Sequence, residues 1–220
     1  MADDLVSVPL TIRLEGPRVA LRAPRPTDIA ALRALLERNG DHLRPWSPSP
    51  PPGVNPLGFA ELGRALARQR RDWKAGAAHV FVTVLRDAHE PIVGRVALTS
   101  ITRGPWQSAQ LGYWIDARYV RQGLMSEALE LSLEFAFGML GLHRVQAAVM
   151  PMNRPSRHLL AKYGFREEGY AYRYLRIAGS WEDHVIYALT HEEWRPSLEG
   201  RRALRVSAGD DGQLAAGSDR

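Results

Sequence analysis

Two junctions between a strand and a helix carry the residue types that bind anions. The first junction is VRQGLMSEAL at residues 120–129, which follows a predicted strand ending in Asp116 and leads into the longest predicted helix. The first N–H groups of a helix have no acceptor within the helix and share its partial positive charge, so they suit a phosphate group. Gly123 has no side chain to keep a ligand from the backbone, and Arg121 can add a charged hydrogen bond. Taken alone, this segment also fits an ordinary loop.

The second junction lies further along the chain, where a short predicted strand leads into NRPSRHLL at residues 153–160. Asn153 and Ser156 are three residues apart, so the amide of Asn153 can cap the helix, face a ligand, or do both. Arg154 and Arg157 add positive charge beside them. Two such helix ends facing one cleft predict a site for a long ligand with several phosphates.

The elements that must position these junctions alternate along the chain. Runs rich in β-branched and aromatic residues predict strands, and apolar residues at helical spacing predict helices. Six prolines between Asp41 and Pro56 predict a loop there. The pattern indicates an α+β class, with a central and mostly antiparallel sheet flanked by about four helices. The predicted strands are residues 18–22, 79–86, 91–101, 109–116, 144–149, 166–176 and 184–189. One predicted helix begins at residue 29, and three others cover residues 57–76, 124–140 and 155–163.

The length and the composition of the two ends predict one folded domain. The chain has 220 residues, which is enough for a single domain with a full core. Residues 197–220 are rich in Gly, Ala, Ser and Asp, with few large apolar side chains. We therefore expect an N-terminal extension at residues 1–9, the domain at residues 10–196 and a disordered C-terminal tail at residues 197–220.

The composition excludes several classes of site. The chain has no cysteine, which excludes disulfides, thiolate nucleophiles, zinc–cysteine sites and iron–sulfur clusters. No apolar run reaches the roughly 18 residues that cross a bilayer, and the acidic N-terminus lacks a signal peptide, so we expect a cytoplasmic protein without membrane contact. The net charge of +5 suits an anionic ligand but is far from the dense basic surface of a nucleic-acid-binding protein. Direct binding of nucleic acid is not expected.

Together these segments resemble the GNAT superfamily of N-acetyltransferases, and within it the RimJ/RimL-like branch of ribosomal-protein alanine N-acetyltransferases. The resemblance spans residues 18–194 and rests on VRQGLMSEAL, NRPS followed by KYGF, RVALRAPRPTD, HLRPW and GSWEDH. It implies a sheet that splays between the fourth and fifth predicted strands, acetyl-CoA as the cosubstrate and no metal. It also implies direct transfer of the acetyl group to the N-terminal α-amine of a protein, with a ribosomal protein as acceptor and association with the ribosome.

The resemblance also assigns roles to individual residues. The superfamily's pyrophosphate loop falls on residues 120–125, where Gly123 matches the first glycine and Val120 and Met125 depart from the pattern. Residues 113–115 match the strand whose main chain pairs with the pantetheine arm, and Asn153 with Ser156 matches the N-x-x-S motif of the branch. The implied acetyl-CoA-binding residues are Tyr113, Trp114, Ile115, Arg121, Gln122, Gly123, Leu124, Met125, Ser126, Asn153, Ser156 and Arg157.

For the catalytic groups, the resemblance implies an acid and leaves the base open. Ser156, with Asn153 beside it, is the implied hydrogen-bond donor to the departing sulfur. The tyrosine that many members place seven residues after the asparagine is Leu160 here, and Tyr163 lies about one helical turn further on. The glutamate that RimL-like enzymes use as a base falls on Leu175. The remaining candidates for the base are Asp116, Asp183, Glu182, His184 or a chain of waters.

The acceptor side is predicted from the proline-rich segment. Trp46 stands among prolines, and His42 precedes it, so both are candidates for the acceptor wall together with Tyr113; a small local core is the alternative for Trp46. Two other functions remain open: a GNAT enzyme that acetylates a small-molecule amine such as an antibiotic or metabolite, and a catalytically weak CoA-binding protein associated with the ribosome. The sequence motifs of P-loop, Rossmann, hydrolase-elbow and zincin sites are absent.

Overall fold

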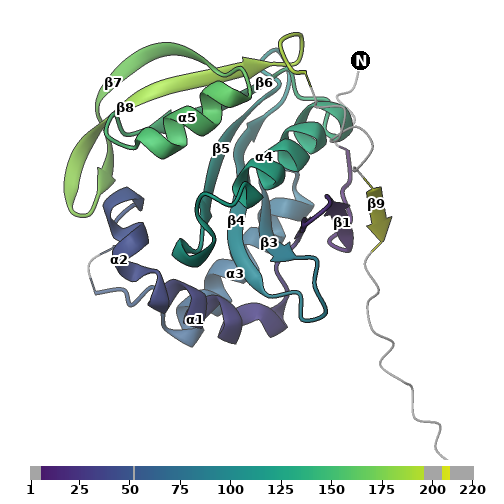
Figure 1. The fold of residues 1–220 in the computed structure, drawn as a ribbon, viewed down its shortest axis with the longest axis vertical. Coiled ribbons are helices and arrows are strands. Elements are labelled where there is room, and N and C mark those ends of the chain that lie inside the picture. The colour runs from purple at the N-terminus through teal and green to yellow at the C-terminus, as the bar shows by residue number, and fades with distance from the viewer. Residues whose placement is uncertain (1–5, 52, 196–204, 209–220) are drawn as a thin grey trace, which may run out of the picture.

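The computed structural model describes residues 6–51, 53–195 and 205–208. Its centre is one nine-stranded sheet with the strand order β7-β8-β6-β5-β4-β3-β2-β1-β9 (Figure 1). Helices lie on both faces of this sheet, so the predicted α+β class is confirmed. The strands are β1 (Ile12–Glu15), β2 (Val19–Arg22), β3 (His79–Leu85), β4 (Ile92–Thr102), β5 (Ser108–Ile115), β6 (Arg144–Val149), β7 (Arg166–Ile177), β8 (Ser180–Thr190) and β9 (Arg205–Ala208).

Two apolar clusters cover the two faces of the sheet. Successive strand residues point to opposite faces, so Phe81 of β3 joins the main core beneath α4 while Val82 joins a smaller cluster beneath α1. Among the described residues, no helix is long and apolar enough to cross a membrane. The helices are α1 (Ile29–Arg38), α2 (Gly40–Leu43), α3 (Phe59–Lys74), α4 (Leu124–Glu134) and α5 (Arg154–Lys162), with short 3-10 segments η1 (Pro26–Asp28), η2 (Arg44–Trp46) and η3 (Ala117–Tyr119).

The sheet opens between β5 and β6. These two strands run parallel and pair only through residues 108–110 of β5 and 144–146 of β6. β5 then continues to Ile115 and β6 to Val149 without further pairing to each other, while β4 and β8 pair with their outer edges. The predicted splay is therefore confirmed. Because β1 was not predicted, the strands predicted as the fourth and fifth are β5 and β6 in the structure.

Three local elements differ from the prediction. β1 was not predicted, although Ile12 and Leu14 are buried and the strand pairs with β2. The proline-rich segment was predicted as a loop but begins with α2 and η2, because proline is compatible with the first turn of a helix. The helix predicted to reach residue 140 is α-helical only to Glu134 and continues as one π-helical turn, η4 (Phe135–Met139).

Both ends of the chain contribute to the folded structure. Val8, in the expected N-terminal extension, is buried, and its carbonyl accepts a hydrogen bond from Trp73 Nε1 at 2.9 Å. Within the tail that was expected to be disordered, residues 205–208 form β9 instead. β9 pairs with β1, whose edge would otherwise expose unpaired backbone groups. Residues 1–5 and the remainder of the predicted tail, 197–204 and 209–220, lie outside the described residues.

Candidate active site

The structure places the two predicted junctions on one face of the sheet, but the first turn of α4 contacts the C-terminal end of α5 and not its start. α4 and α5 lie on the same face of the sheet, one on each side of β5 (Figure 1). Tyr163, at the end of α5, donates a hydrogen bond to the Ser126 carbonyl in the first turn of α4 at 2.6 Å. Ser156, near the start of α5, contacts Tyr113 of β5. The stretch of β5 that lacks a partner strand is thus in contact with the start of α5.

The first turn of α4 has the backbone geometry of an anion site. Gly123 caps the helix with φ of 78°, and Arg121 has φ of 62°, so both lie in the left-handed region. The first backbone bond of α4 runs from Glu127 N–H to the Gly123 carbonyl, and so the N–H groups of residues 124–126 have no acceptor within the helix. A non-glycine residue held in this region stores strain, which is typical of ligand-binding loops.

Several predicted binding residues can reach a ligand only through their main chain. Leu124 and Met125 are buried in the main core. Ile115 joins the same core, whereas Trp114 packs on the opposite face against the cluster beneath α1. The structure therefore leaves main-chain groups of α4 and β5, and not these four side chains, available at the gap.

Arg18 holds the loop before α4, a contact that sequence reasoning missed. Its Nη1 donates to the Gln122 carbonyl at 2.9 Å, and its Nε donates to Glu127 Oε2 at 3.0 Å. Glu127 Oε1 also accepts from the backbone N–H groups of Arg18 and Val19, at 2.7 and 2.9 Å. The turn between β1 and β2 is thus tied to the first turn of α4. The two partners are 109 residues apart in sequence, so no local signal marks the pair.

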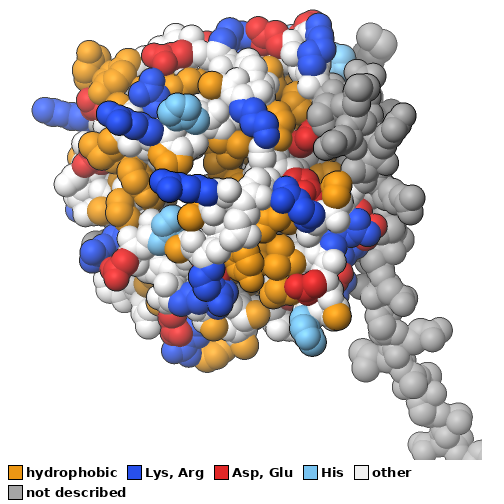
Figure 2. All heavy atoms as spheres, in the orientation of Figure 1, with side chains coloured by type: hydrophobic (Ala, Val, Ile, Leu, Met, Phe, Trp, Pro, Cys, Tyr) orange, Lys and Arg blue, Asp and Glu red, His pale blue; other side chains and the backbone are white. Residues whose placement is uncertain are grey.

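A cavity of about 320 Å³ lies beside this turn. Arg18, Gly123, Ser126 and Lys162 are among its lining residues, and Lys162 Nζ donates to Ser126 Oγ at 2.6 Å. Figure 2 shows arginine and lysine side chains spread over this face of the molecule, with a hollow between α5 and the start of α4. Within the described part of the chain, no group of three or more side chains is placed to hold a metal ion.

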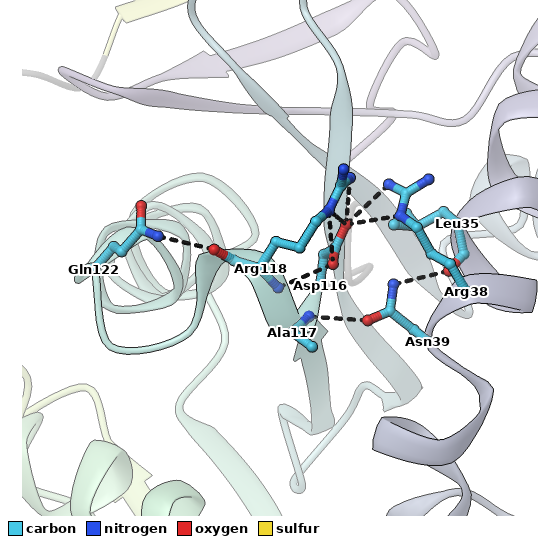
Figure 3. Close-up of polar contacts among 7 residues, drawn as sticks. All are labelled: Leu35, Arg38, Asn39, Asp116, Ala117, Arg118 and Gln122. Atoms are coloured by element: carbon cyan, nitrogen blue, oxygen red, sulfur yellow. Dashed lines mark hydrogen bonds and ion pairs between the residues drawn. The ribbon is translucent and has the colours of Figure 1, made fainter.

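Asp116 anchors the end of β5 to α1 (Figure 3). Its buried carboxylate accepts hydrogen bonds from Arg38 Nε and Nη2 at 3.0 and 2.9 Å, and from Arg118 Nη2 at 2.9 Å. Burial raises the pKa of Asp116, but the hydrogen bonds from Arg118 and Arg38 outweigh it and hold the pKa well below its usual range. A carboxylate that is so acidic and so fully engaged is a poor proton acceptor, which argues against Asp116 as the base.

The same network closes the loop that leads into α4. Asn39 Oδ1 accepts from the Ala117 N–H at 2.9 Å, and Asn39 Nδ2 donates to the Leu35 carbonyl at 2.8 Å (Figure 3). Gln122 Nε2 donates to the Arg118 carbonyl at 2.9 Å. The side chain of Gln122, a predicted ligand, is therefore used inside the loop.

Tyr113 and Ser156 form a hydroxyl pair across the gap. Tyr113 Oη lies 2.8 Å from Ser156 Oγ. Asn153 caps α5 by accepting from the Ser156 N–H at 3.2 Å, so the helix-capping interpretation of the N-x-x-S segment holds in this structure. Burial raises the pKa of Tyr113 to about 12, an effect that the hydrogen bond to Ser156 partly offsets. Tyr113 is therefore protonated at neutral pH and can donate to Ser156 Oγ.

Two other candidates on α5 are engaged elsewhere. Arg157 Nε donates to Tyr187 Oη at 2.8 Å, and Arg157 Nη1 donates to the Pro151 carbonyl at 3.2 Å, so its guanidinium group is used to join α5 to the sheet. Tyr163 bonds to Ser126. Leu160, at the family's tyrosine position, is fully buried. The hydroxyl groups that meet at the gap are those of Tyr113 and Ser156.

The remaining base candidates lie on β8. The partly exposed Asp183 accepts from the Arg173 N–H at 2.8 Å and from Tyr170 Oη at 3.0 Å, and these bonds lower its pKa. Glu182 is partly exposed and stands directly opposite Leu175 in the β7–β8 pair. Directly opposed side chains on one face of a sheet have Cβ atoms about 5 Å apart. Glu182 thus lies next to the position at which the family places its glutamate.

The proline-rich segment reaches the β7–β8 hairpin. His42 is exposed on α2, and Trp46 on η2 is 37% exposed. Beyond Trp46, the Ser49 N–H donates to the Arg176 carbonyl at 3.2 Å, and Ser49 Oγ accepts from the Gly179 N–H at 2.7 Å. The segment from α1 to the hairpin therefore bridges the sheet on the face opposite α4, with α2 beside the hairpin tip (Figure 1).

The chain is similar to known acetyltransferases in sequence and in structure. The family model described as the acetyltransferase (GNAT) domain matches residues 18–166, a range that contains the start of α4 and the Tyr113–Ser156 pair. The [ribosomal protein uS5]-alanine N-acetyltransferase of Escherichia coli K12 is 35% identical over 187 residues, covering 84% of this chain and 94% of that protein.

Two solved structures are similar along nearly the whole length of both chains. Mycobacterium smegmatis RimJ in complex with CoA-disulfide has a TM-score of 0.77 and 33% identity, over 87% of this chain and 90% of that chain. The ribosomal-protein-S5-alanine acetyltransferase from Vibrio fischeri has a TM-score of 0.76 and 30% identity, over 84% of this chain and 99% of that chain.

Proposed function

Because this chain belongs to the acetyltransferase (GNAT) family and is an acetyl-CoA-dependent N-acetyltransferase, we propose that it acetylates the N-terminal α-amine of a protein, with an alanine-starting ribosomal protein as the acceptor. The observation that carries the proposal is the opening between β5 and β6, which has bare helix amides at one side and the Tyr113–Ser156 pair at the other. The choice of acceptor rests on the similarity to the E. coli and V. fischeri enzymes.

The start of α4 is the proposed pyrophosphate site. The N–H groups of residues 124–126 and the left-handed Gly123 give a concave, positively polarised turn. Arg18 and the Asp116 network hold this turn in place before any ligand arrives. Main-chain groups of residues 113–115 are the proposed partners of the pantetheine arm, because they belong to the part of β5 that lacks a neighbouring strand.

Ser156 is the proposed donor to the leaving sulfur. Acetyl-CoA supplies the activated thioester, and the leaving thiolate needs a hydrogen bond or a proton. Either hydroxyl of the Tyr113–Ser156 pair can be the donor; when Tyr113 donates to Ser156 Oγ, the Ser156 proton is free to point into the gap. Asn153 has a positioning role, since its cap orients the first turn of α5.

Glu182 is the proposed proton acceptor for the amine. Its place opposite Leu175 puts a carboxylate near the family's usual position, whereas Asp116 and Asp183 are occupied by hydrogen bonds. An N-terminal amine has a pKa of about 8, so part of it is neutral at pH 7 and only a modest base is required. His42 and Trp46 are the proposed wall for the incoming peptide.

The test uses the full chain, acetyl-CoA and peptides that carry the N-terminal sequences of ribosomal proteins from the source organism. Mass spectrometry should locate one acetyl group on the α-amine of alanine-starting peptides. Ser156→Ala should lower kcat by about tenfold or more, whereas the exposed Ser180→Ala should match wild type. A pull-down from a lysate tests whether ribosomes co-purify.

Two results would contradict the proposal. Acetylation of small amines without acetylation of any peptide would favour a small-molecule acetyltransferase. Tight CoA binding without turnover on either panel would favour a catalytically weak binding protein.

A further inference from the structure

Arg95 is an anomaly in the middle of β4. Its Nε is buried and has no hydrogen-bond partner. Over residues 6–51, 53–195 and 205–208, no hydrogen bond or ion pair to its guanidinium group is found. Burial lowers the pKa of Arg95, and no carboxylate counteracts this effect. Arg95 as a whole is partly buried, but its Nε is kept from water without a hydrogen-bond acceptor, which is costly to the fold.

Two other arginines in the described part of the chain are largely withdrawn from solvent and have hydrogen-bond partners for their guanidinium groups, which Arg95 lacks. Arg22 pairs with Asp28 through two hydrogen bonds, of 2.7 and 2.9 Å. Arg103 also has an unpartnered Nε, but its Nη1 donates to the Leu140 carbonyl at 2.7 Å and to Gln107 Oε1 at 3.1 Å. A buried polar group without a partner calls for a specific explanation, and a ligand is one.

The position of Arg95 connects it to the acceptor side of the gap. Its neighbours across the sheet are Val82 on β3 and Trp114 on β5, and both belong to or pack against the cluster beneath α1. Arg95 therefore faces α1 and the segment that carries His42 and Trp46, not α4.

The surface near Arg95 is open at Gly112. Gly112 of β5 pairs with Ala97, two residues from Arg95, and so lies on the same face of the sheet. Gly112 is exposed, and a side chain placed on it would meet no atom of the described residues within 4 Å. Diagonal neighbours across a sheet are about 7–8 Å apart, which the long side chain of an arginine can span. A molecule lying over Gly112 can thus reach the Arg95 guanidinium group.

We propose that Arg95 binds a carboxylate of the acceptor, so that the enzyme prefers protein N-termini with an acidic side chain close to the reacting amine. This inference rests on the proposed function and names the acceptor class more narrowly. A guanidinium group binds a carboxylate through two parallel hydrogen bonds, and such a partner supplies the charge that the site lacks.

The distance between the reacting amine and Arg95 determines which residue of the acceptor carries the acidic side chain. Neighbouring strands are about 5 Å apart, and Arg95 is one strand away from β5, whose other edge faces the gap. The distance from the reacting amine to the Arg95 side chain is thus on the order of 5–10 Å. Because an extended chain advances about 3.3 Å per residue, the acidic side chain belongs to the second or third residue of the acceptor.

The test measures binding and does not require turnover. Two peptides that start with alanine and differ only by Glu or Gln at the second or third residue are titrated into the protein saturated with CoA, using isothermal calorimetry. Wild type should bind the Glu peptide about tenfold tighter or more. Arg95→Gln should bind both peptides equally.

A stability measurement separates ligand binding from a structural role. If Arg95 is kept for a ligand, Arg95→Gln without peptide should have a Tm equal to or higher than that of wild type, because an unpaired buried charge is removed. It should also bind CoA with unchanged affinity. The control Arg103→Gln should lower Tm, since it breaks two hydrogen bonds, and should keep the preference for the Glu peptide.

Each outcome either supports or overturns the inference. Equal binding of the two peptides by wild type, the absence of binding by both, or a preference that survives in Arg95→Gln would overturn it. Preferred binding of the Glu peptide that is lost in Arg95→Gln supports it even if neither peptide is acetylated. In that case the proposed function fails while the carboxylate site stands.

Discussion

Replacing Asp116 with asparagine tests whether the buried carboxylate holds the end of β5 in place. The change keeps the shape of the side chain but removes the charge that Arg38 and Arg118 share. Breaking a buried ion pair by removing one partner costs about 3–5 kcal/mol. The side chains of Arg38 and Arg118 are 38% and 61% exposed, so water replaces part of what they lose. We therefore expect the free energy of unfolding to fall by about 2–3 kcal/mol at neutral pH.

Thermal unfolding followed by circular dichroism checks this value. For a chain of this length, the loss corresponds to a fall in Tm of about 4–12 °C. The folded pKa of Asp116 lies below its unfolded value, so its contribution to stability is complete above a pH of about 4 and is lost as the pH falls further. The difference between wild type and Asp116→Asn should therefore shrink in acid.

A matched control comes from an exposed pair. Asp41→Asn removes a carboxylate that lies 3.7 Å from Arg44 in a fully solvated position, so its Tm should not change measurably. Because the Arg118 carbonyl accepts a hydrogen bond from Gln122 Nε2 in the loop before α4, where we propose that the pyrophosphate binds, Asp116→Asn should raise the Kd for CoA several-fold. A Tm for Asp116→Asn within about 2 °C of wild type, or a difference that does not depend on pH, would refute this reasoning.

Three further changes probe the site directly. Gly123→Ala forces a side chain into φ of 78° with its Cβ 3.2 Å from Arg18 Nη2, so calorimetry should show weaker CoA binding; unchanged affinity would contradict the proposed pyrophosphate turn. Tyr113→Phe removes the hydroxyl partner of Ser156, and steady-state assays should show kcat falling by about tenfold with the KM for acetyl-CoA little changed. Glu182→Gln should lower kcat/KM by about tenfold or more at pH 7, and the deficit should narrow above a pH of about 8, where the acceptor amine is already neutral. A deficit that does not depend on pH would remove Glu182 as the base.

Much of the fold follows from local patterns. The strands at residues 79–85, 92–102, 108–115 and 144–149 were predicted to within two residues, because alternation, β-branched content and turn residues are properties of short segments. β1 and β9 were not predicted, because they form by pairing with each other at the edge of the sheet and their own short sequences do not show this.

The sequence predicted a candidate site and some of its residues, but not how their side chains are engaged. Gly123 and Asn153 are recognisable because a tight turn and a helix cap require these residue types at fixed spacing. Sequence reasoning could not tell that Asp116 is held by two arginines or that Tyr113 meets Ser156, since these contacts join residues up to 78 positions apart.

The sequence by itself determined the class of fold, the two helix ends that suit an anion and the absence of cysteine chemistry, since each depends on composition or on neighbours along the chain. Only the tertiary structure decided which polar groups are already satisfied and which remain available. Arg157 and Tyr163 are engaged within the protein, whereas the guanidinium group of Arg95 has no partner among the residues that the structure describes. Hydrogen-bond satisfaction depends on every element packed around a group, and for that reason it appears only once the chain has folded.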